Sequence, residues 1–266
     1  MNASMPLPDQ KELAKLYAQY VDTFRLADGT LPPMMELKRI HTAHVVANAE
    51  LIAEGEHFDA PTRCAALAAA LLHDTGRYEQ LKRYNTFRDS DSVDHAVFSH
   101  DIVQEKGWLE RGSFAAGMKE SILAAILYHN RRELPEGLPP LTLLASHTVR
   151  DADKLDIFRV LEDQIKSTSW REASQAFWNL STTAAPNPAV VQAIAARQPV
   201  DYQNIKSLAD FVLIQVGWMV SGLYFATARQ ICRARGHLEF RRNFLHQLTD
   251  DPSIDILCDL AARSLM

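Results

Sequence analysis

The sequence has few cysteines, and none of them forms a closely spaced pair. Cys64, Cys232 and Cys258 are the only three in 266 residues, and no Cys-x-x-Cys motif occurs. An odd number of widely separated thiols argues against a disulfide framework and against a zinc–thiolate cluster. We therefore expect buried free thiols in a reducing compartment, and the cytoplasm is the default location.

The chain also lacks a leader pattern, a membrane-spanning run and an excess of positive charge. Its first residues, MNASMPLPDQKE, show no basic segment followed by an apolar one, so we expect no signal peptide. The most apolar stretch, 211–228, contains Gln215, Ser221 and two glycines, which favours a buried helix over a membrane span. The net charge of −5 argues against a protein that coats nucleic acid, although it leaves small phosphorylated substrates open.

Strand-like alternation of apolar and polar residues is absent, and helical spacing dominates instead. Hydrophobic residues make up 47% of the chain, which is enough for a substantial core. The sequence therefore predicts an all-α fold in a single all-helical domain over 1–266. Its expected helices cover 9–27, 34–54, a stretch from about Pro61 to Leu72, segments that begin near Asp94 and Phe114, and 140–166, with loops at 181–188 and 196–199. The basic stretch 232–244 is expected to form a solvent-facing helical surface.

Motifs of nucleophilic and nucleotide-binding enzymes are missing too. The chain contains no Gly-x-Ser-x-Gly, no glycine-rich phosphate loop and no His-Glu-x-x-His. A catalytic function therefore has to come from a different set of residues.

An adjacent histidine and aspartate end the most apolar helical run of the first hundred residues. The run CAALAAALL (64–72) leads directly into His73 and Asp74, and Gly76 follows as an expected helix end. One interpretation is that His73 and Asp74 simply cap the helix. The other is that they bind a metal ion at the point where the helix ends.

Further histidines and an aspartate lie on apolar helical faces. His41 stacks between Leu37 and Val45, but His44 on the same helix has similar spacing, so the helix alone does not choose between them. The other polar members of apolar faces are His95, beside Phe98, Ser99 and Ile102; His129, at the end of a face with Met118, Ile122, Ala125 and Ile126; and Asp153, between Val149 and Ile157.

Each of these residues alone is most simply a hydrogen-bonded core residue or a helix cap, but together they favour a metal site. A buried carboxylate is costly unless a charge or a metal ion meets it. Imidazole and carboxylate ligands without thiolates suit Mn, Fe, Zn or Mg, and Co and Ni are not distinguished from them. We therefore predict a site for divalent metal formed by His41, His73, Asp74, His95, His129 and Asp153.

The order of these residues resembles the HD superfamily of metal-dependent phosphohydrolases. The matching contexts are HTAHV around His41, LLHDTGR around His73 and Asp74, and ADKLD around Asp153, within residues 20–165. The resemblance implies an HD-type helical bundle, with 167–266 as an additional helical layer. It also selects His41 over His44, and Asp153 over Asp151 and Asp156. The stretch from Gly76 to Ala96 is similar to a bacterial subgroup of that superfamily.

The resemblance extends to a second metal position. His95 and His129 fall where binuclear members of the superfamily place extra histidines, although many of those members have a His-His pair where this chain has His129-Asn130. With a single ion, His95 and His129 would instead bind substrate phosphate. Asp74, with two carboxylate oxygens, could bridge two ions.

A group of basic residues follows the His73-Asp74 pair and predicts phosphate binding. Arg77, Lys82, Arg83 and Arg88 are interleaved with Tyr78, Tyr84 and Phe87. The alternative is a solvated amphipathic segment. Arg77 is the preferred phosphate ligand because it is closest to the metal pair, and Lys154, next to Asp153, is a further catalytic candidate.

The leading functional hypothesis is hydrolysis of a phosphomonoester or phosphodiester, with nucleotides among the candidates, by metal-activated water. The resemblance also covers proteins that use a di-iron centre to activate oxygen, and a metal-binding regulatory module without turnover is a third hypothesis. We expect a small phosphorylated substrate and neither a nucleic-acid nor a membrane partner. The sequence leaves the oligomeric state open, homo-oligomers included.

Overall fold

The computed structural model describes residues 10–167 and 180–266, and within these ranges the fold is all-α, as predicted. No strand occurs in the described residues, where Ser181 and Ser207 form only an isolated bridge. The α-helices are α1 (Gln10–Asp22), α2 (Pro33–Gly55), α3 (Ala60–Leu72), α4 (Gly76–Tyr84), α5 (His95–Glu105), α6 (Trp108–Arg111), α7 (Ala116–Tyr128), α8 (Pro140–Ser167), α9 (Pro188–Ala195), α10 (Leu208–Gly217), α11 (Ala226–Ala234), α12 (His237–Leu248) and α13 (Ser253–Ser264).

The chain divides into two compact units, Met1–Asp153 and Lys154–Met266. The division falls inside α8, so one helix contributes to both units. The predicted division into a core over 20–165 and an accessory layer over 167–266 stays a prediction, as does the assignment of all 266 residues to a single domain.

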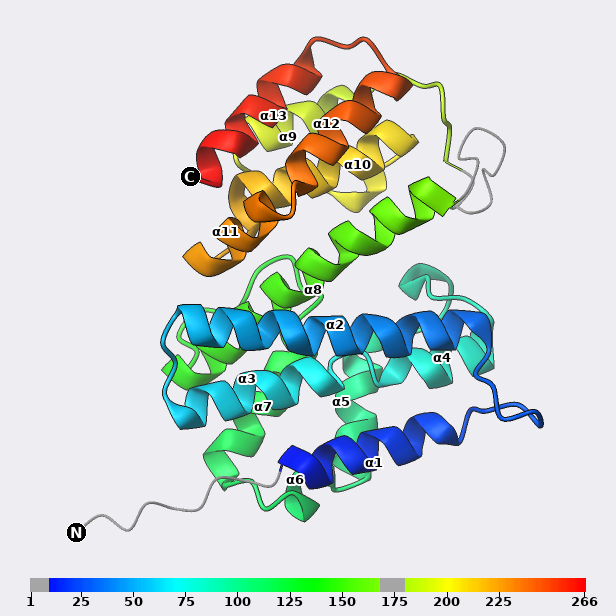
Figure 1. Cartoon of the computed structure of the whole chain (residues 1–266), viewed down its shortest axis with the longest axis vertical. Helices are drawn as coiled ribbons and strands as arrows, with labels where there is room; N and C mark the ends of the chain where they lie inside the picture. The colour runs from blue at the N-terminus through cyan, green and yellow to red at the C-terminus, as the bar shows by residue number, and fades with distance from the viewer. Residues whose placement is uncertain (1–9, 168–179) are drawn as a thin grey trace. The chain divides into compact units, whose positions relative to one another are not determined.

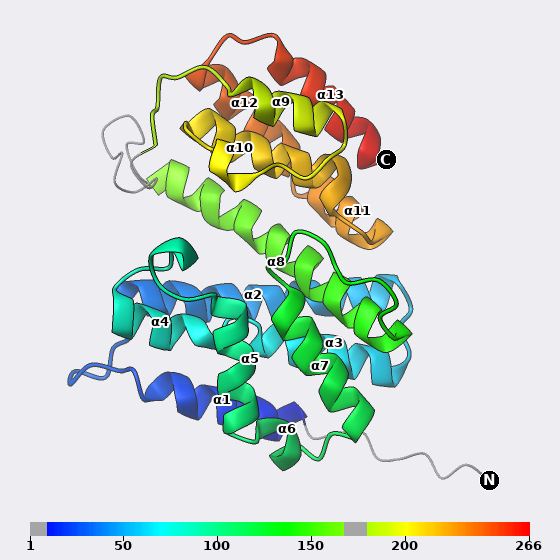
Figure 2. The same cartoon turned by 180° about the vertical axis from the view of Figure 1, so that it is seen from behind.

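The first unit is a bundle whose centre is the apolar helix α3. Helix α3 packs against α1, α2 and α7, while α5 packs against α4 and α7 (Figures 1 and 2). Small residues allow this close packing, because Ala65, Ala66, Ala69 and Ala70 of α3 are completely buried. The end of α3 therefore lies in the interior of the unit, where its polar residues have little contact with water.

Local sequence explains where the helices of the first unit begin. The Asp59 side chain accepts a hydrogen bond from the Thr62 amide at the start of α3, and Pro61 occupies the first turn. The Asp94 side chain does the same for the Ala96 amide at the start of α5. Both helices begin within a residue or so of the predicted positions.

Gly76 has a different role from the predicted helix end. It is the first residue of α4, and a Cβ atom placed on it would lie 2.7 Å from the backbone nitrogen of Ser99 and 3.0 Å from the carbonyl oxygen of His95. Glycine is therefore needed here because α4 and α5 approach each other closely. The Ser99 hydroxyl also accepts a hydrogen bond from the Gly76 amide.

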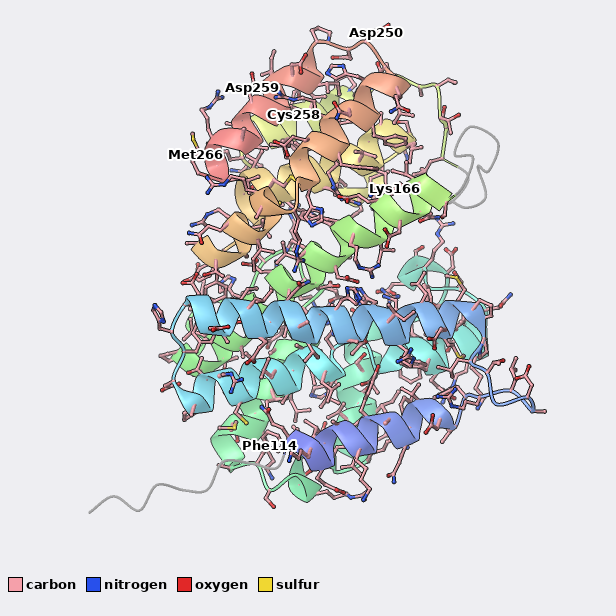
Figure 3. The ribbon with its side chains drawn as sticks, in the orientation of Figure 1. Phe114, Lys166, Asp250, Cys258, Asp259 and Met266 are labelled. Atoms are coloured by element: carbon pink, nitrogen blue, oxygen red, sulfur yellow. The ribbon has the colours of Figure 1, made fainter. Side chains whose placement is uncertain are left out.

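The second unit contains α9 to α13 and the C-terminal part of α8. Within it, α10 packs against α9, α12 and α13. The stretch predicted as one helix over 211–228 is divided, because a π-helical turn, Trp218–Gly222, follows α10 and an extended residue precedes α11. Among the described helices, none is both long enough and apolar enough to cross a bilayer. Cys258, labelled on α13 in Figure 3, is a buried free thiol, as are Cys64 and Cys232.

The basic stretch 232–244 is not uniformly exposed, so the expectation of a solvent-facing surface is wrong for part of it, including two of its basic residues. His237 is buried and Arg241 is completely inaccessible. Arg241 donates to Glu162 Oε1 at 2.8 Å and to Gln215 Oε1 at 2.7 Å, and His237 Nδ1 donates to the same Glu162 oxygen at 2.6 Å. We call Glu162, Gln215, His237 and Arg241 the arginine cluster. Its buried partners explain the burial of a charge that the local sequence suggests is solvated.

Candidate metal centre

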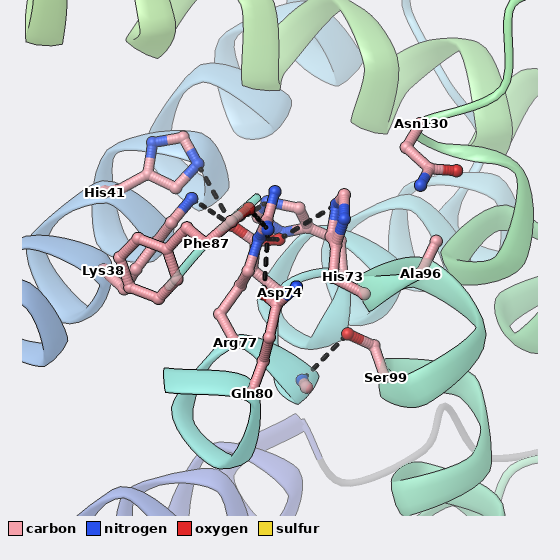
Figure 4. Close-up of polar contacts among 12 residues, drawn as sticks. Lys38, His41, His73, Asp74, Arg77, Gln80, Phe87, Ala96, Ser99 and Asn130 are labelled. Carbon is pink, nitrogen blue, oxygen red and sulfur yellow. Dashed lines mark hydrogen bonds and ion pairs between the residues drawn. The ribbon is translucent and has the colours of Figure 1, made fainter. Parts of the chain in front are cut away.

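Six predicted ligands converge in the first unit, and we call them the histidine–aspartate cluster. They come from α2, from the turn after α3, from the start of α5, from the end of α7 and from α8: His41, His73, Asp74, His95, His129 and Asp153. Three overlapping groups of three place ligand atoms within 4.8 Å of one another, and all six residues belong to at least one group. Figure 4 shows several of these side chains directed toward Asp74.

The two carboxylate oxygens of Asp74 face two different pairs of histidines. Oδ2 lies 3.7 Å from His41 Nε2 and 3.6 Å from His73 Nε2. Oδ1 lies 3.6 Å from His95 Nε2 and 3.8 Å from His129 Nε2. Asp74 therefore lies between two candidate ligand sets and contributes one oxygen to each of them.

Asp153 completes the first of these sets. Its Oδ1 lies 3.0 Å from His41 Nε2 and 3.9 Å from His73 Nε2. His41, His73, Asp74 and Asp153 thus supply two nitrogens and two carboxylate oxygens from α2, α8 and the turn after α3. This donor set, without thiolates, is one that divalent transition metals accept.

The orientation of the rings leaves the Nε2 lone pairs of three histidines directed into the cluster. His73 Nδ1 donates to the Ala70 carbonyl at 2.8 Å, and His129 Nδ1 donates to the Ile126 carbonyl at 2.7 Å. A carbonyl can only accept, so Nδ1 carries the proton in both rings, and Nε2 of the neutral ring is a bare acceptor. His95 Nδ1 is likewise held, by the Asp89 carboxylate at 2.5 Å.

This arrangement fits a metal ion better than it fits an ordinary polar core. His73 Nε2 is buried without a hydrogen-bond partner. His95 Nε2 and His129 Nε2 are 3.0 Å apart, and in neutral rings held at Nδ1 their lone pairs would repel each other. A shared cation would remove both problems.

The electrostatics of the cluster favour ligand-ready protonation states. Burial, reinforced by His95 and His73, lowers the pKa of His129 to about 3, and burial also lowers the pKa of His73. Burial opposes ionisation of Asp74, but Lys38, His73 and Arg77 outweigh it and hold its pKa well below the usual range. Near neutral pH these two histidines are therefore neutral and Asp74 is ionised, as metal ligands must be.

Two cations flank Asp74. Lys38 Nζ lies 2.6 Å from Asp74 Oδ2, and Arg77 Nε lies 3.4 Å from Asp74 Oδ1. Both cations also lie over the ring of Phe87, at 5.6 Å from its centroid in each case. Arg77, predicted from its position in the sequence, is therefore beside the cluster, and Lys38 was missed by the sequence analysis. Its spacing of three residues before His41, which places both on one helical face, could have identified it.

The other predicted phosphate ligands lie on the surface, where each has an acidic partner. Lys82 is 3.9 Å from Glu79, Arg83 is 2.8 Å from the same carboxylate, and Arg88 is 3.4 Å from Asp91. More than half of each of these three basic side chains is exposed. The structure does not bring them to the cluster. They match the alternative of a solvated amphipathic segment, although the segment begins as helix α4 and not as a loop.

The remaining candidates are placed as follows. Lys154 is the first residue of the second unit, and its Cε atom lies 3.6 Å from the position of a Cβ on Gly222. His44 is exposed, whereas His41 is buried. Asp156 is buried and pairs with Arg159 at 2.6 Å, and Asp151 is also buried. Neither Asp151 nor Asp156 belongs to a candidate ligand group among the described residues.

The fold and the cluster together define an all-α protein whose buried histidines and aspartates could hold a divalent metal ion. Residues 39–157 match the family model of the HD domain, and this stretch contains all six cluster residues. The match over these residues confirms the resemblance that the motifs of the sequence indicated. Comparisons with the curated proteins and with the solved structures found no match.

Proposed function

We propose that this chain is a metal-dependent phosphohydrolase that cleaves a small phosphomonoester or phosphodiester, with nucleotides among the candidate substrates. The observation that supports the proposal most directly is the position of Asp74, whose two oxygens face two separate pairs of imidazole nitrogens. We expect a cytoplasmic location and a small phosphorylated substrate, as inferred from the sequence.

The cluster residues would hold one or two divalent ions. His41, His73, Asp74 and Asp153 would hold the first, and Asp74, His95 and His129 would hold the second. A divalent ion bound there lowers the pKa of a coordinated water toward neutrality and withdraws charge from a phosphoryl oxygen. Mn, Fe, Co, Ni, Mg and Zn all remain candidates, because nitrogen and oxygen donors accept each of them to some degree.

Lys38 and Arg77 would bind and orient the phosphate. Both are cations at the edge of the cluster, and their side chains are only 16% and 14% exposed. Cations in a partly buried site interact more strongly with a phosphate than surface cations do. The Lys38 ammonium donates to Asp74 Oδ2. A metal ion bound to that oxygen would leave the ammonium available to donate to a substrate oxygen. Arg77 is held in place by the Phe87 carbonyl and by Asp89, and its Nε is buried without a hydrogen-bond partner.

Phosphate release is the test of this proposal. Metal-free protein is reconstituted separately with Mn, Fe, Co, Ni and Mg, and inorganic phosphate is measured with nucleotides, sugar phosphates and aryl phosphates as substrates. We expect release that depends on the metal and is lost in Asp74→Asn. Asp101→Asn is the matched control, because the Asp101 side chain is 52% exposed and pairs only with the neighbouring His100 in the known contacts.

Two results would contradict the proposal. The first is that metal-loaded protein releases no phosphate from any of these substrates. The second is that phosphate release persists in Asp74→Asn, which would mean that another site carries the chemistry.

If no phosphate is released, a further measurement distinguishes the alternatives. Iron-dependent oxygen consumption would favour the oxygen-activating alternative, and metal binding with neither activity would favour a regulatory module.

A further inference from the structure

Asp89 lies between a predicted metal ligand and a predicted phosphate ligand and was not singled out by its sequence. It opens a short 3-10 turn, Asp89–Asp91, in the connection between α4 and α5. Its side chain is 33% exposed, and its two oxygens have different partners. The contacts of each oxygen show what this residue does.

Oδ2 of Asp89 holds the ring of His95. His95 Nδ1 lies 2.5 Å from this oxygen, and the His95 amide donates to it at 3.4 Å. A carboxylate that accepts from Nδ1 fixes the tautomer, so the lone pair of His95 is on Nε2. Nε2 is the atom that faces His129 Nε2 at 3.0 Å and Asp74 Oδ1 at 3.6 Å.

Oδ1 of Asp89 binds two side chains of the N-terminal half of α4. It accepts from Arg77 Nη1 at 3.0 Å and from Gln80 Nε2 at 3.0 Å. Both oxygens of Asp89 therefore accept hydrogen bonds at the same time, Oδ2 from His95 and Oδ1 from Arg77 and Gln80.

The surrounding turn fixes Asp89 in this position. Gln80 is completely buried, and its amide also donates to Ser92 Oγ at 2.9 Å and to the Val93 carbonyl at 3.1 Å. Arg77 Nη1 donates to the Phe87 carbonyl at 2.7 Å. The residues on both sides of Asp89 are thus bound to α4, so the carboxylate is held rigidly between α4 and α5.

Neighbouring carboxylates have other partners. Asp94, which lies near His95, caps α5 and pairs with Arg131 at 2.6 Å and with Asn130 at 3.0 Å. Asp91 is about half exposed and pairs with Arg88 at 3.4 Å. Asp74 lies near the inner atoms of the same two residues, His95 Nε2 and Arg77 Nε, whereas Asp89 contacts their outer atoms, His95 Nδ1 and Arg77 Nη1.

We propose that Asp89 is the positioning residue that prepares His95 to bind the second metal ion and couples that ion to the placement of Arg77. This inference rests on the proposed metal-dependent function and concerns one of its two ligand sets. Outer carboxylates that orient a ligating histidine typically contribute about 10–100-fold to metal affinity. Asp89 should therefore affect the second ion far more than the first, because the first ligand set has no contact with it in the known interactions.

Replacement of Asp89 by asparagine removes one of its two functions whichever way the amide turns. Both oxygens of the carboxylate accept hydrogen bonds, but an amide has one acceptor and one donor. With its oxygen toward His95, the amide NH2 faces the NH groups of Arg77 and Gln80. With its NH2 toward His95, Nδ1 of His95 must accept, and Nε2 then carries the proton and cannot bind a metal.

The experiment is a titration of metal-free protein with Co²⁺, followed by calorimetry and by the absorption spectrum of the bound ion. We expect the wild-type protein to bind two ions. We expect Asp89→Asn to bind the first ion with unchanged affinity and the second about 10–100-fold more weakly, with a changed spectrum only in the second step. Asp91→Asn is the matched control from the same turn and should behave like the wild-type protein.

The outcomes separate this inference from the proposed function. Two ions bound with unchanged affinities in Asp89→Asn, or a wild-type protein that binds only one ion, would overturn the role of Asp89 and leave hydrolysis intact. A wild-type protein that binds no divalent ion would overturn the proposed function itself. If Asp89→Asn does not fold, Asp89→Glu takes its place: it keeps both acceptor oxygens but lengthens the side chain. It should weaken the second ion by a smaller factor, and no weakening in that variant would also refute the inference.

Discussion

The two units of this chain each bury a polar cluster, and the two clusters differ in what balances their charges. The arginine cluster contains its own cation: Arg241 donates to Glu162, to Gln215 and to the carbonyls of Phe158 and His237. Only His237 Nε2 and Gln215 Nε2 lack a partner there among the buried side-chain atoms. The histidine–aspartate cluster instead directs several acceptor atoms toward one another, and its cations lie at the edge.

This difference shows that burial of charged groups does not by itself identify a functional site. The arginine cluster balances its own charges, because Arg241 pairs with Glu162, and it can serve as a structural connection between α8, α10 and α12. A cation in the centre of the histidine–aspartate cluster would satisfy the facing nitrogens of His95 and His129 and the unpartnered Nε2 of His73. A buried cluster of acceptors that faces inward is therefore the stronger indication of a bound ion.

The largest effect on stability is expected from removal of the Arg241 cation of the arginine cluster. Arg241→Met leaves the Glu162 carboxylate buried without its main partner, and we expect a loss of about 3–5 kcal/mol in the free energy of unfolding, measured with urea. Arg242→Met is the control, because Arg242 is 35% exposed and pairs with surface aspartates, so its loss should be within about 1 kcal/mol. Equal losses in the two variants would contradict the structural role of the arginine cluster.

The histidine–aspartate cluster should respond to an added ion where the arginine cluster does not. At a Mn²⁺ concentration of about 100 times its dissociation constant, binding to the folded state alone stabilises it by about 2.7 kcal/mol. We expect this gain in thermal unfolding of the wild-type protein and its absence in Asp74→Asn. An equal gain in both proteins would show that Mn²⁺ binds elsewhere.

A methyl group added between α4 and α5, beside the histidine–aspartate cluster, should lower the free energy of unfolding by less than the loss of Arg241 does. In Gly76→Ala, the new methyl group would contact the backbone of Ser99 and His95, so α4 and α5 must move apart. We expect a loss of about 1–3 kcal/mol in chemical denaturation. Gly117→Ala on α7 is the matched control, since a Cβ there would meet nothing within 4 Å. It should be neutral or stabilising by up to about 1 kcal/mol. A neutral Gly76→Ala would contradict the close approach of α4 and α5.

The smallest effect is a pH dependence of the arginine cluster. Burial disfavours the Glu162 carboxylate, but His237 and Arg241 outweigh it, so the folded-state pKa is lowered from 4.5. A carboxyl group with a lowered folded-state pKa stabilises the protein above its unfolded-state pKa, and this contribution is lost as the pH falls through the folded-state value. The stability difference between the wild-type protein and Glu162→Gln should therefore be constant from pH 7 to about pH 5 and should shrink below pH 4.5. A stability difference between the two proteins that is unchanged at pH 3 would contradict a lowered folded-state pKa of Glu162.

Much of the fold could be predicted because it depends on local patterns. The apolar spacing, Asp59 before α3 and Asp94 before α5 specify where helices begin. The division of the apolar stretch 211–228 by a π-helical turn could not be predicted from composition. The helix α4 was also missed, because its polar residues obscure the few that it buries, Tyr78 among them.

The candidate site was predicted in its ligands and missed in its supporting residues. His41, His73 and Asp153 lie on apolar faces, and the motif order selects them from their neighbours. Lys38 is part of no motif and could be found only from its position one turn before His41. Asp89 contacts His95 across a turn, which the sequence pattern does not show. Arg241 was assigned to the surface for the same reason, since its partner Glu162 is 79 residues away.

The continuity of α8 has a practical consequence for work on this protein. The helix is 28 residues long, about 42 Å at 1.5 Å per residue, and it carries Asp153 at the last position of the first unit. An expression fragment cut at the boundary would place this aspartate on a frayed helix end, without the following turn that holds its backbone. A fragment intended to retain the histidine–aspartate cluster should therefore extend at least two turns past Asp153, even though those residues belong to the second unit.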